Sequence, residues 1–397
     1  MFTRYKQSLL KLLTDLHEAR NKPFENITKW LSIQEALLKK IIYIENRIRT
    51  VKREIKDINL FRKNPNNRLT KTESLRAKGK IENKENQIEE YRRLLTIYHN
   101  IGDAIAFTFI DKHDIKPQTF KESAGFMSEK SGLKREKQMF KYAYKNGVVA
   151  ILNDLTSALR YTDITLIAEN HSPNYVEVKT SENRNERTER QKLNAEKVFK
   201  YLNEDETEGL YEVDQKMKRV ALGSVEINYI KTINELIDIS KMKGSAYRLV
   251  EPGVLYFVSH SEPSLDEDLS LIFKNHKLHR PTVFMLNTMK FPEEGYYPFS
   301  LSILNPINYI DFLEGVFTII SFVDMQIIDK VAKQYKFKQE ASLDPRYIFR
   351  FINERKRADL SEFYMSAHFF QRIALEFVSL QWLLTDTFER AVKKGIL

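Results

Sequence analysis

The stretch RYTDITLIAENHSPNYVEVK, residues 160–179, decides the expected fold of the middle of the chain. The run from about Leu159 to Ile167 indicates one strand, and Tyr175 to Lys179 indicates another. The residues HSPN at 171–174 are typical of a turn. We therefore expect an antiparallel β-hairpin in this part of the chain.

Charged side chains interrupt these otherwise apolar strands. Glu177 and Lys179 are two residues apart, so in a strand they point to the same face. Asp163, on the preceding strand, can lie opposite them. Charged groups inside an apolar strand are costly, and sequences usually retain them where a site needs them. The pattern predicts that two carboxylates and an ammonium converge at one end of a small sheet.

This combination of groups suits the hydrolysis of a phosphodiester bond. Asp163 and Glu177 would hold a divalent cation, which polarises the phosphate and lowers the pKa of a bound water. Lys179 would position or deprotonate that water and stabilise the charge of the transition state. The chain has no cysteine, and its eight histidines form no pair at metal-ligand spacing. Any metal is therefore expected to be held by oxygen ligands, which favour Mg²⁺, Mn²⁺ or Ca²⁺. For the hydrolysis of a phosphodiester we expect Mg²⁺ or Mn²⁺.

The elements on either side extend the pattern. Leu133 to Asn146 is expected to be a helix that ends at Gly147, and Val148 to Leu152 a strand. A further helix is expected from about Glu186 to Leu202. The order is then helix, three strands, helix.

With these residues in this order, residues 133–203 resemble the PD-(D/E)xK nuclease superfamily, which has the restriction-endonuclease-like fold. The matching acid is Asp163, and the matching tripeptide is Glu177-Val178-Lys179. The resemblance implies a further metal-proximal glutamate at Glu136 and a metal contact from the backbone carbonyl of Val178. It also implies a catalytic glutamine at Gln191.

Two positions depart from the family pattern. Thr162 replaces the proline of the family's name, and Ala195 stands where the RecB-like branch has a tyrosine. The fuller motif of that branch is therefore not met. The alternative to a nuclease-like site is an exposed hairpin whose charges match the pattern by coincidence.

Four arginines near the hairpin are candidates for contact with nucleic acid: Arg160, Arg184, Arg187 and Arg190. The last three recur every three residues, so on a helix they would share one side within reach of phosphates. The alternative is a solvated helix face, because glutamates interleave with them and can pair with them. Arg160 could equally pair with a structural carboxylate.

The first hundred residues are expected to be helical. From Leu37 to Ile58 the apolar residues alternate steps of three and four, which is a heptad pattern. A breaker cluster around Pro65 and a capping box at Thr70 and Glu73 then predict a second helix. Two long helices with a short loop suggest an antiparallel coiled-coil hairpin, which packs on itself or forms a dimer seam. A further apolar helix or helix pair is expected from Gly102 to Ile115.

The net charge of +10 is unevenly distributed. Residues 1–100 hold 23 Lys or Arg against 12 Asp or Glu, whereas the remainder holds 41 against 42. This asymmetry suggests a basic N-terminal arm that meets a polyanion. The alternative is a solvated helical surface that is rich in lysine.

Beyond residue 205 the pattern is mixed. Val220 to Ile230, Gly253 to Ser259 and Thr282 to Leu286 are expected strands. A helix-rich tail is expected from about Asn308, with a long amphipathic helix between Leu360 and Lys393.

The chain is thus expected to be an α+β and α/β multidomain protein. Residues 1–127 would form a helical domain, 128–205 a nuclease-like core (with an extension to about 260 left open), and 206–397 a regulatory or substrate-selecting region. The N-terminus lacks the pattern of a secretory signal, and no run is apolar enough to span a bilayer, so we expect a cytoplasmic protein with no membrane partner.

Three functions compete. The first is a divalent-metal-dependent endonuclease that cuts DNA, with RNA also open, and whose setting is similar to prokaryotic anti-phage nucleases of the Shedu or restriction type. The second is a non-catalytic nucleic-acid-binding or scaffold protein that uses its coiled coil and basic arm. The third is an effector that stays inert until a protein partner or trigger engages it. The N-terminal helices also suggest a homo-oligomer.

Overall fold

The computed structural model describes residues 3–64, 66–67, 69–121, 125–178, 186–210, 216–219, 221–260, 267–288, 295–344, 346–354 and 362–394. The protein is mixed α/β: long N-terminal helices pack together, several small antiparallel sheets follow, and helices end the chain. It divides into two compact units, residues 1–218 and 219–397, which are described separately. Within the described part, no helix is long and apolar enough to cross a membrane.

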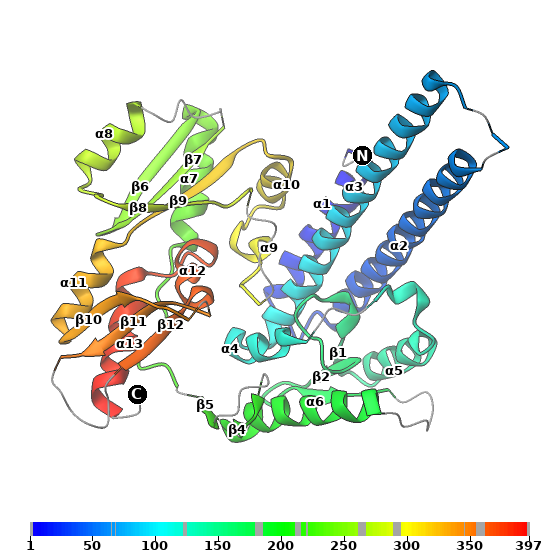
Figure 1. Ribbon diagram of the computed structural model, residues 1–397. Helices are drawn as coiled ribbons and strands as arrows, with labels where there is room; N and C mark the ends of the chain where they lie inside the picture. The colour runs from blue at the N-terminus through cyan, green and yellow to red at the C-terminus, as the bar shows by residue number, and fades with distance from the viewer. Residues whose placement is uncertain are drawn as a thin grey trace. The chain divides into compact units, whose positions relative to one another are not determined.

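The first unit opens with three helices, α1 (Thr3–Arg20), α2 (Ile27–Lys63) and α3 (Lys71–Phe109). The long helices α2 and α3 form the expected antiparallel hairpin (Figure 1). The heptad positions Ile41, Ile44, Ile48 and Val51 are buried within this single chain. Ile55 and Ile58, nearer the tip, are only partly buried. The part of the seam from Ile41 to Val51 is therefore covered by the chain itself.

Helix α3 begins at the expected capping box and is longer than expected. The Glu73 amide donates to the Thr70 hydroxyl at 3.2 Å, and the Thr70 amide donates to the Glu73 carboxylate at 2.9 Å. The helix runs through Gly102 without a break, so the expected start of a separate helix at Gly102 is wrong. A Cβ atom at Gly102 would lie 1.9 Å from the carbonyl oxygen of Leu155. This glycine permits close packing and does not end the helix.

Short elements follow the hairpin: α4 (Lys112–Ile115), η1 (Lys116–Phe120), η2 (Met127–Glu129), α5 (Leu133–Lys145), β1 (Val149–Leu152), η3 (Asn153–Leu155), β2 (Ile164–Ile167), β3 (Asn174–Val176), α6 (Glu186–Glu204), β4 (Glu206–Glu208) and β5 (Lys216–Lys218). Strands β1, β2 and β3 form an antiparallel sheet in that order, and β4 pairs with β5. The expected order of helix, three strands and helix is confirmed in α5, β1, β2, β3 and α6.

Strand β2 is shorter than expected, because the backbone before it bonds elsewhere. The Leu159 amide donates to the Thr156 hydroxyl at 3.0 Å, and the Asp163 carbonyl accepts from the Asn153 amide at 3.0 Å. The sheet therefore begins only at Ile164, which pairs with Val176 of β3. Lys179, the last residue of the expected third strand, lies outside the described residues.

Helices cover this sheet from two directions. Gln34 of α2 bonds to the edge strand β1: its amide nitrogen donates to the Ala150 carbonyl at 2.8 Å, and its amide oxygen accepts from the Leu152 amide at 3.0 Å. These bonds satisfy part of an edge that would otherwise be unpaired. Tyr175 of β3 stacks on Phe199 of α6, with ring centroids 4.7 Å apart. The sheet is thus fixed to the helical hairpin on one side and to α6 on the other.

The second unit contains two antiparallel sheets and their helices. Its elements are α7 (Ile230–Lys243), β6 (Ser245–Glu251), β7 (Val254–Ser259), α8 (Glu267–Asn275), β8 (Pro281–Met285), α9 (Phe299–Ser302), α10 (Pro306–Glu314), β9 (Thr318–Asp324), α11 (Gln326–Gln334), β10 (Phe337–Ala341), β11 (Tyr347–Asn353), β12 (Glu362–Ser366), α12 (Ala367–Leu375) and α13 (Leu380–Lys394). The strand orders are β6-β7-β9-β8 and β10-β11-β12.

Several expectations for this region are corrected. The strands near 253–259 and 282–286 are confirmed as β7 and β8, but within the described residues of 220–230 only an isolated bridge at Asn228 is found. The tail is less helical than expected, because it contributes strands β9 to β12. Strand β9 is buried along almost its whole length, which explains why an apolar run without alternation was read as helix. The single helix expected from Leu360 to Lys393 is a strand and two helices.

Candidate functional site

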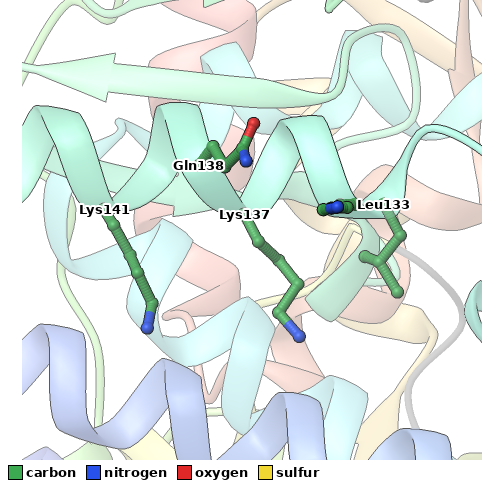
Figure 2. A pocket seen from close by; sticks show the side chains of 5 residues that line it. Leu133, Lys137, Gln138 and Lys141 are labelled. Carbon is green, nitrogen blue, oxygen red and sulfur yellow. The ribbon is translucent and has the colours of Figure 1, made fainter.

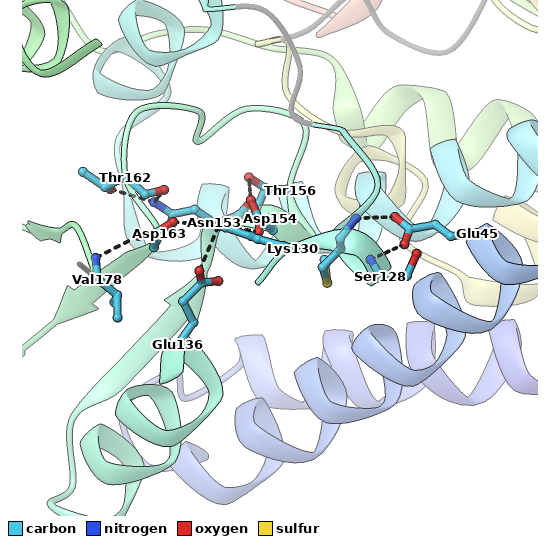
Figure 3. Close-up of polar contacts among 11 residues, drawn as sticks. Glu45, Ser128, Lys130, Glu136, Asn153, Asp154, Thr156, Thr162, Asp163 and Val178 are labelled. Carbon is cyan, nitrogen blue, oxygen red and sulfur yellow. Dashed lines mark hydrogen bonds and ion pairs between the residues drawn. The ribbon is translucent and has the colours of Figure 1, made fainter. Parts of the chain in front are cut away.

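One lysine joins three carboxylates in the first unit (Figure 3). The Lys130 Nζ lies 2.6 Å from Asp163 Oδ1, 2.8 Å from Asp154 Oδ2 and 3.1 Å from Glu136 Oε1. The three acids come from three places in the chain: the residue directly before β2, the turn η3 and the first turn of α5. The Glu136 side chain is only 2% exposed, and those of Asp163 and Asp154 are 13% and 18% exposed. Two of these acids, Asp163 and Glu136, are among the residues expected from the sequence.

The hairpin fixes Asp163 through its own backbone. The Asp163 amide donates to the Val176 carbonyl at 3.1 Å, and the Val178 amide donates to Asp163 Oδ2 at 2.8 Å. One carboxylate oxygen is thus held by the strand after the turn, and the other faces Lys130. The expected proximity of Asp163 to the tripeptide that begins at Glu177 is confirmed at Val178.

Asn153 ties the turn that carries Asp154 to strand β2. Its side-chain nitrogen donates to the Thr162 carbonyl at 3.0 Å, and its oxygen accepts from the Thr165 hydroxyl at 2.8 Å. Asn153 is buried, so these bonds are made without competition from solvent. The turn is consequently held in one position relative to Asp163.

The N-terminal hairpin also holds the site. The Glu45 carboxylate of α2 accepts hydrogen bonds from the amides of Met127 and Ser128 at 3.0 and 2.7 Å, in the turn η2 that precedes Lys130 (Figure 3). Asp103 of α3 accepts from Ser157 and Ala158, after Asp154. Burial raises the pKa of Asp103 to about 6, although these hydrogen bonds lower it. The helical hairpin is thus part of the framework of the site.

Burial and charge alter the titration of the groups around Asp163. Burial raises the pKa of Glu136 to about 7, opposed by the Lys130 ammonium and reinforced by the Asp163 charge. Burial lowers the pKa of Lys130, but Asp154 and Asp163 outweigh it, so the pKa is raised overall. Burial lowers the pKa of a second lysine, Lys121, whereas the charges of Glu177 and Asp163 raise it. The site therefore contains two lysines that the motif did not indicate.

The other three expected catalytic residues are Glu177, Gln191 and Lys179, and they are not all among the described residues. Glu177 is exposed to solvent and interacts electrostatically with Lys121. Gln191 lies in the first turns of α6, but its side chain is outside the described part of the chain, as is the whole of Lys179. The roles proposed for these three residues stay predictions.

The basic residues expected to contact nucleic acid have different surroundings. Arg160 binds backbone carbonyls beside the site, at 2.7 Å from Ser157 and 2.6 Å from Lys121. Arg184 lies outside the described residues, and Arg187 and Arg190 lie in α6 with side chains that are not described. Contact of these arginines with nucleic acid stays a prediction.

Helix α5 presents lysines on the face that turns away from Glu136. Lys134, Lys137 and Lys141, with Leu133 and Gln138, line a shallow hollow of about 380 Å³ (Figure 2). Lys141 pairs with Glu35 of α2 at 2.9 Å. We call these three lysines the α5 lysine face. The charge distribution along the sequence predicts a basic surface only in the first hundred residues and does not indicate this face.

The oxygen donors of the site fit a hard divalent cation in their chemistry. Three carboxylates converge, and Mg²⁺ and Mn²⁺ prefer such ligands. Their present arrangement surrounds an ammonium, and among the described residues no group of three His, Cys, Asp or Glu side chains is arranged as a metal cage. A cation would therefore have to take over contacts that Lys130 now makes.

Comparison with known proteins gives no further assignment. The chain matches no protein-family model, no curated protein and no solved structure.

Proposed function

We propose that this protein is a divalent-metal-dependent nuclease that hydrolyses phosphodiester bonds of DNA, with RNA as a further possible substrate. The observation that carries the proposal is the convergence of Asp163, directly before β2, and Glu136, in the first turn of α5, on the ammonium of Lys130. The secondary-structure order from α5 to α6 supports a restriction-endonuclease-like core, the finer fold that the sequence resemblance implies.

The ligands of the metal would come from the hairpin and helix α5. Asp163 would bind Mg²⁺ or Mn²⁺ through its carboxylate, with Glu136, Glu177 and the carbonyl of Val178 as further ligands. The Val178 amide, by donating to Asp163, would hold that carboxylate in one rotamer. The bound ion would polarise the scissile phosphate and lower the pKa of a water.

The lysines would transfer the proton of the attacking water and stabilise the negative charge on the phosphate. Lys179 remains the proposed residue that positions or deprotonates the water, and Gln191 a proposed supporting residue. Lys121 is a further candidate, because its ammonium interacts electrostatically with Glu177 and Asp163 and burial lowers its pKa. A lysine of this kind releases or accepts a proton more readily than an exposed one.

Cleavage assays on several substrates test the proposal. The full chain would be incubated with linear duplex, supercoiled plasmid, single-stranded DNA and RNA, in Mg²⁺, in Mn²⁺ and in EDTA. We expect strand scission of at least one DNA substrate with metal and none in EDTA. The absence of scission of every substrate with either metal would contradict the proposal, and scission of RNA alone would change its substrate.

A second candidate is a non-catalytic protein that binds nucleic acid through basic surfaces. The observation that favours it is that Lys130 already neutralises part of the acidic cluster, as a purely structural ion-pair network would. In that case the chain would bind DNA with no need for metal and leave it uncut. An anti-phage setting, a homo-oligomer or a protein trigger would be compatible with either function and stays a proposal.

The α5 lysine face provides a prediction about DNA binding. Replacing Lys134 and Lys137 with Gln is expected to weaken binding and to reduce the slope of log K against log salt by roughly 2, because each phosphate contact contributes about 0.9. Fluorescence anisotropy with a labelled duplex between about 50 and 200 mM salt measures this slope. The charge-matched control replaces the exposed Lys231 and Lys274 of the second unit with Gln. Equal slopes for both double variants would rule out this face as a phosphate contact.

A further inference from the structure

Lys130 holds the centre of the acidic cluster, although the proposed chemistry gives it no role. A lysine ammonium has three hydrogen-bond donors. Its Nζ lies within 3.1 Å of an oxygen of Asp163, of Asp154 and of Glu136, so each donor can meet one carboxylate. The carboxylates together carry more negative charge than one ammonium neutralises, so the cluster continues to attract cations.

The backbone around Lys130 is fixed, whereas its side chain has a route to solvent. The Lys130 amide donates to the Met127 carbonyl at 3.1 Å, and Glu45 accepts from the amides of Met127 and Ser128. The Lys130 side chain is still 31% exposed, in contrast to the 2% of Glu136. The ammonium can thus leave the carboxylates by rotation of its four-carbon stem, with no movement of the backbone.

A divalent cation and the ammonium cannot both occupy the centre of this cluster. An ion bound to Asp163 and Glu136 would lie within a few ångströms of Lys130 Nζ. At about 4 Å, even two unit charges repel by about 4 kcal/mol at an effective dielectric of 20, and a divalent ion repels more. Either the metal or the ammonium therefore binds these oxygens.

We propose that Lys130 is a built-in competitor of the metal: a divalent cation displaces its ammonium, and the released Asp154 joins Asp163 and Glu136 around the ion. This inference rests on the proposed function, because it concerns the same metal site. It adds Asp154 as a ligand and assigns to Lys130 the role of holding the metal-free site in shape. Lys130 then neutralises part of the charge of the metal-free site, and a metal binds only when its free concentration is high enough to displace the lysine.

Direct measurement of Mn²⁺ binding tests the inference without any cleavage. The metal-stripped full chain is titrated with Mn²⁺ while the free ion is followed by electron paramagnetic resonance. Lys130→Met is expected to bind Mn²⁺ at least about tenfold more tightly than the wild type, because it removes both the competitor and a positive charge. The control Lys145→Met removes an exposed lysine at the end of α5, away from the cluster, and is expected to bind as the wild type does.

Two further variants make the result independent of folding defects. Lys130→Gln should also bind Mn²⁺ more tightly than the wild type. Without metal, Lys130→Gln should unfold at a lower temperature than the wild type. Addition of Mn²⁺ should restore its unfolding temperature. Asp154→Asn in the Lys130→Met background should lose about tenfold in affinity relative to Lys130→Met alone if Asp154 is a ligand.

The possible results separate the inference from the proposed function. Equal or weaker Mn²⁺ binding by both Lys130 variants overturns the competition, and it leaves the nuclease to be judged by its own cleavage assay. Unchanged affinity on removal of Asp154 overturns its role as a ligand. No Mn²⁺ binding by any variant overturns the inference, and a lack of metal-dependent cleavage as well overturns the proposed function.

Discussion

Replacing Asp163 with Asn is expected to reduce metal-dependent DNA cleavage on the order of a thousandfold, the largest effect on activity that we predict. The substitution preserves size and one oxygen but removes the charge that would bind the metal. A metal ion contributes several kcal/mol of charge stabilisation to the transition state. A loss of about 4 kcal/mol corresponds to roughly three factors of ten in rate. Single-turnover cleavage with saturating protein measures the effect on the chemical step.

A neighbouring acid provides the control for this substitution. Glu169 is exposed on the turn between β2 and β3, so Glu169→Gln also removes one negative charge from the hairpin. We expect Glu169→Gln to cleave at a rate close to that of the wild type. If Asp163→Asn retained more than a tenth of the wild-type rate while DNA binding was unchanged, Asp163 could not be a metal ligand in the reaction.

Gly102→Ala is expected to destabilise the first unit by about 3 kcal/mol, the upper end of the usual cost of overpacking. The added Cβ would lie 1.9 Å from the carbonyl oxygen of Leu155. This is a backbone atom, which cannot rotate away as the end of a side chain can. To relieve the clash, α3 or the turn η3 must shift, and η3 carries Asp154. We therefore expect a loss of stability together with a loss of activity.

The two tryptophans of the chain lie in different units, so fluorescence can measure the stability of the first unit. Trp30 is buried in the first unit and Trp382 lies in the second, so in a Trp382→Phe background the fluorescence reports the first unit alone. Urea unfolding gives the free-energy difference from the midpoint and slope. The control Gly79→Ala, on the same helix with nothing within 4 Å of the added Cβ, should stabilise by up to about 1 kcal/mol. Equal stability of the two alanine variants would contradict the close approach at Gly102.

The sequence predicted those parts of the fold and site that depend on local pattern. The heptad spacing predicted the buried seam from Ile41 to Val51, and the capping box predicted the start of α3. The hairpin pattern brought Asp163 next to the chain after β3, because a two-strand register follows from the turn between the strands. These elements share a short-range cause, the periodicity of side chains along one helix or strand.

The remainder depends on contacts between distant parts of the chain. Lys130 lies in a polar connection that gives no periodic signal, and its position follows from Glu45, which is far away in sequence. Asp154 lies in the short turn η3 after the buried strand β1, and polar residues at such a place are a usable signal. Gly102 was read as a helix boundary because the approach of Leu155 is a tertiary contact. The buried strand β9 lacks the alternation that distinguishes strand from helix.

The most direct test of the central claim is one series of single-turnover cleavage reactions with wild type, Asp163→Asn and Glu136→Gln, each in Mg²⁺ and in EDTA. We predict cleavage by the wild type in Mg²⁺ and loss of nearly all of it in the other five reactions. Cleavage that persists in EDTA, or in both substituted chains with Mg²⁺, would contradict a metal-dependent nuclease centred on Asp163 and Glu136.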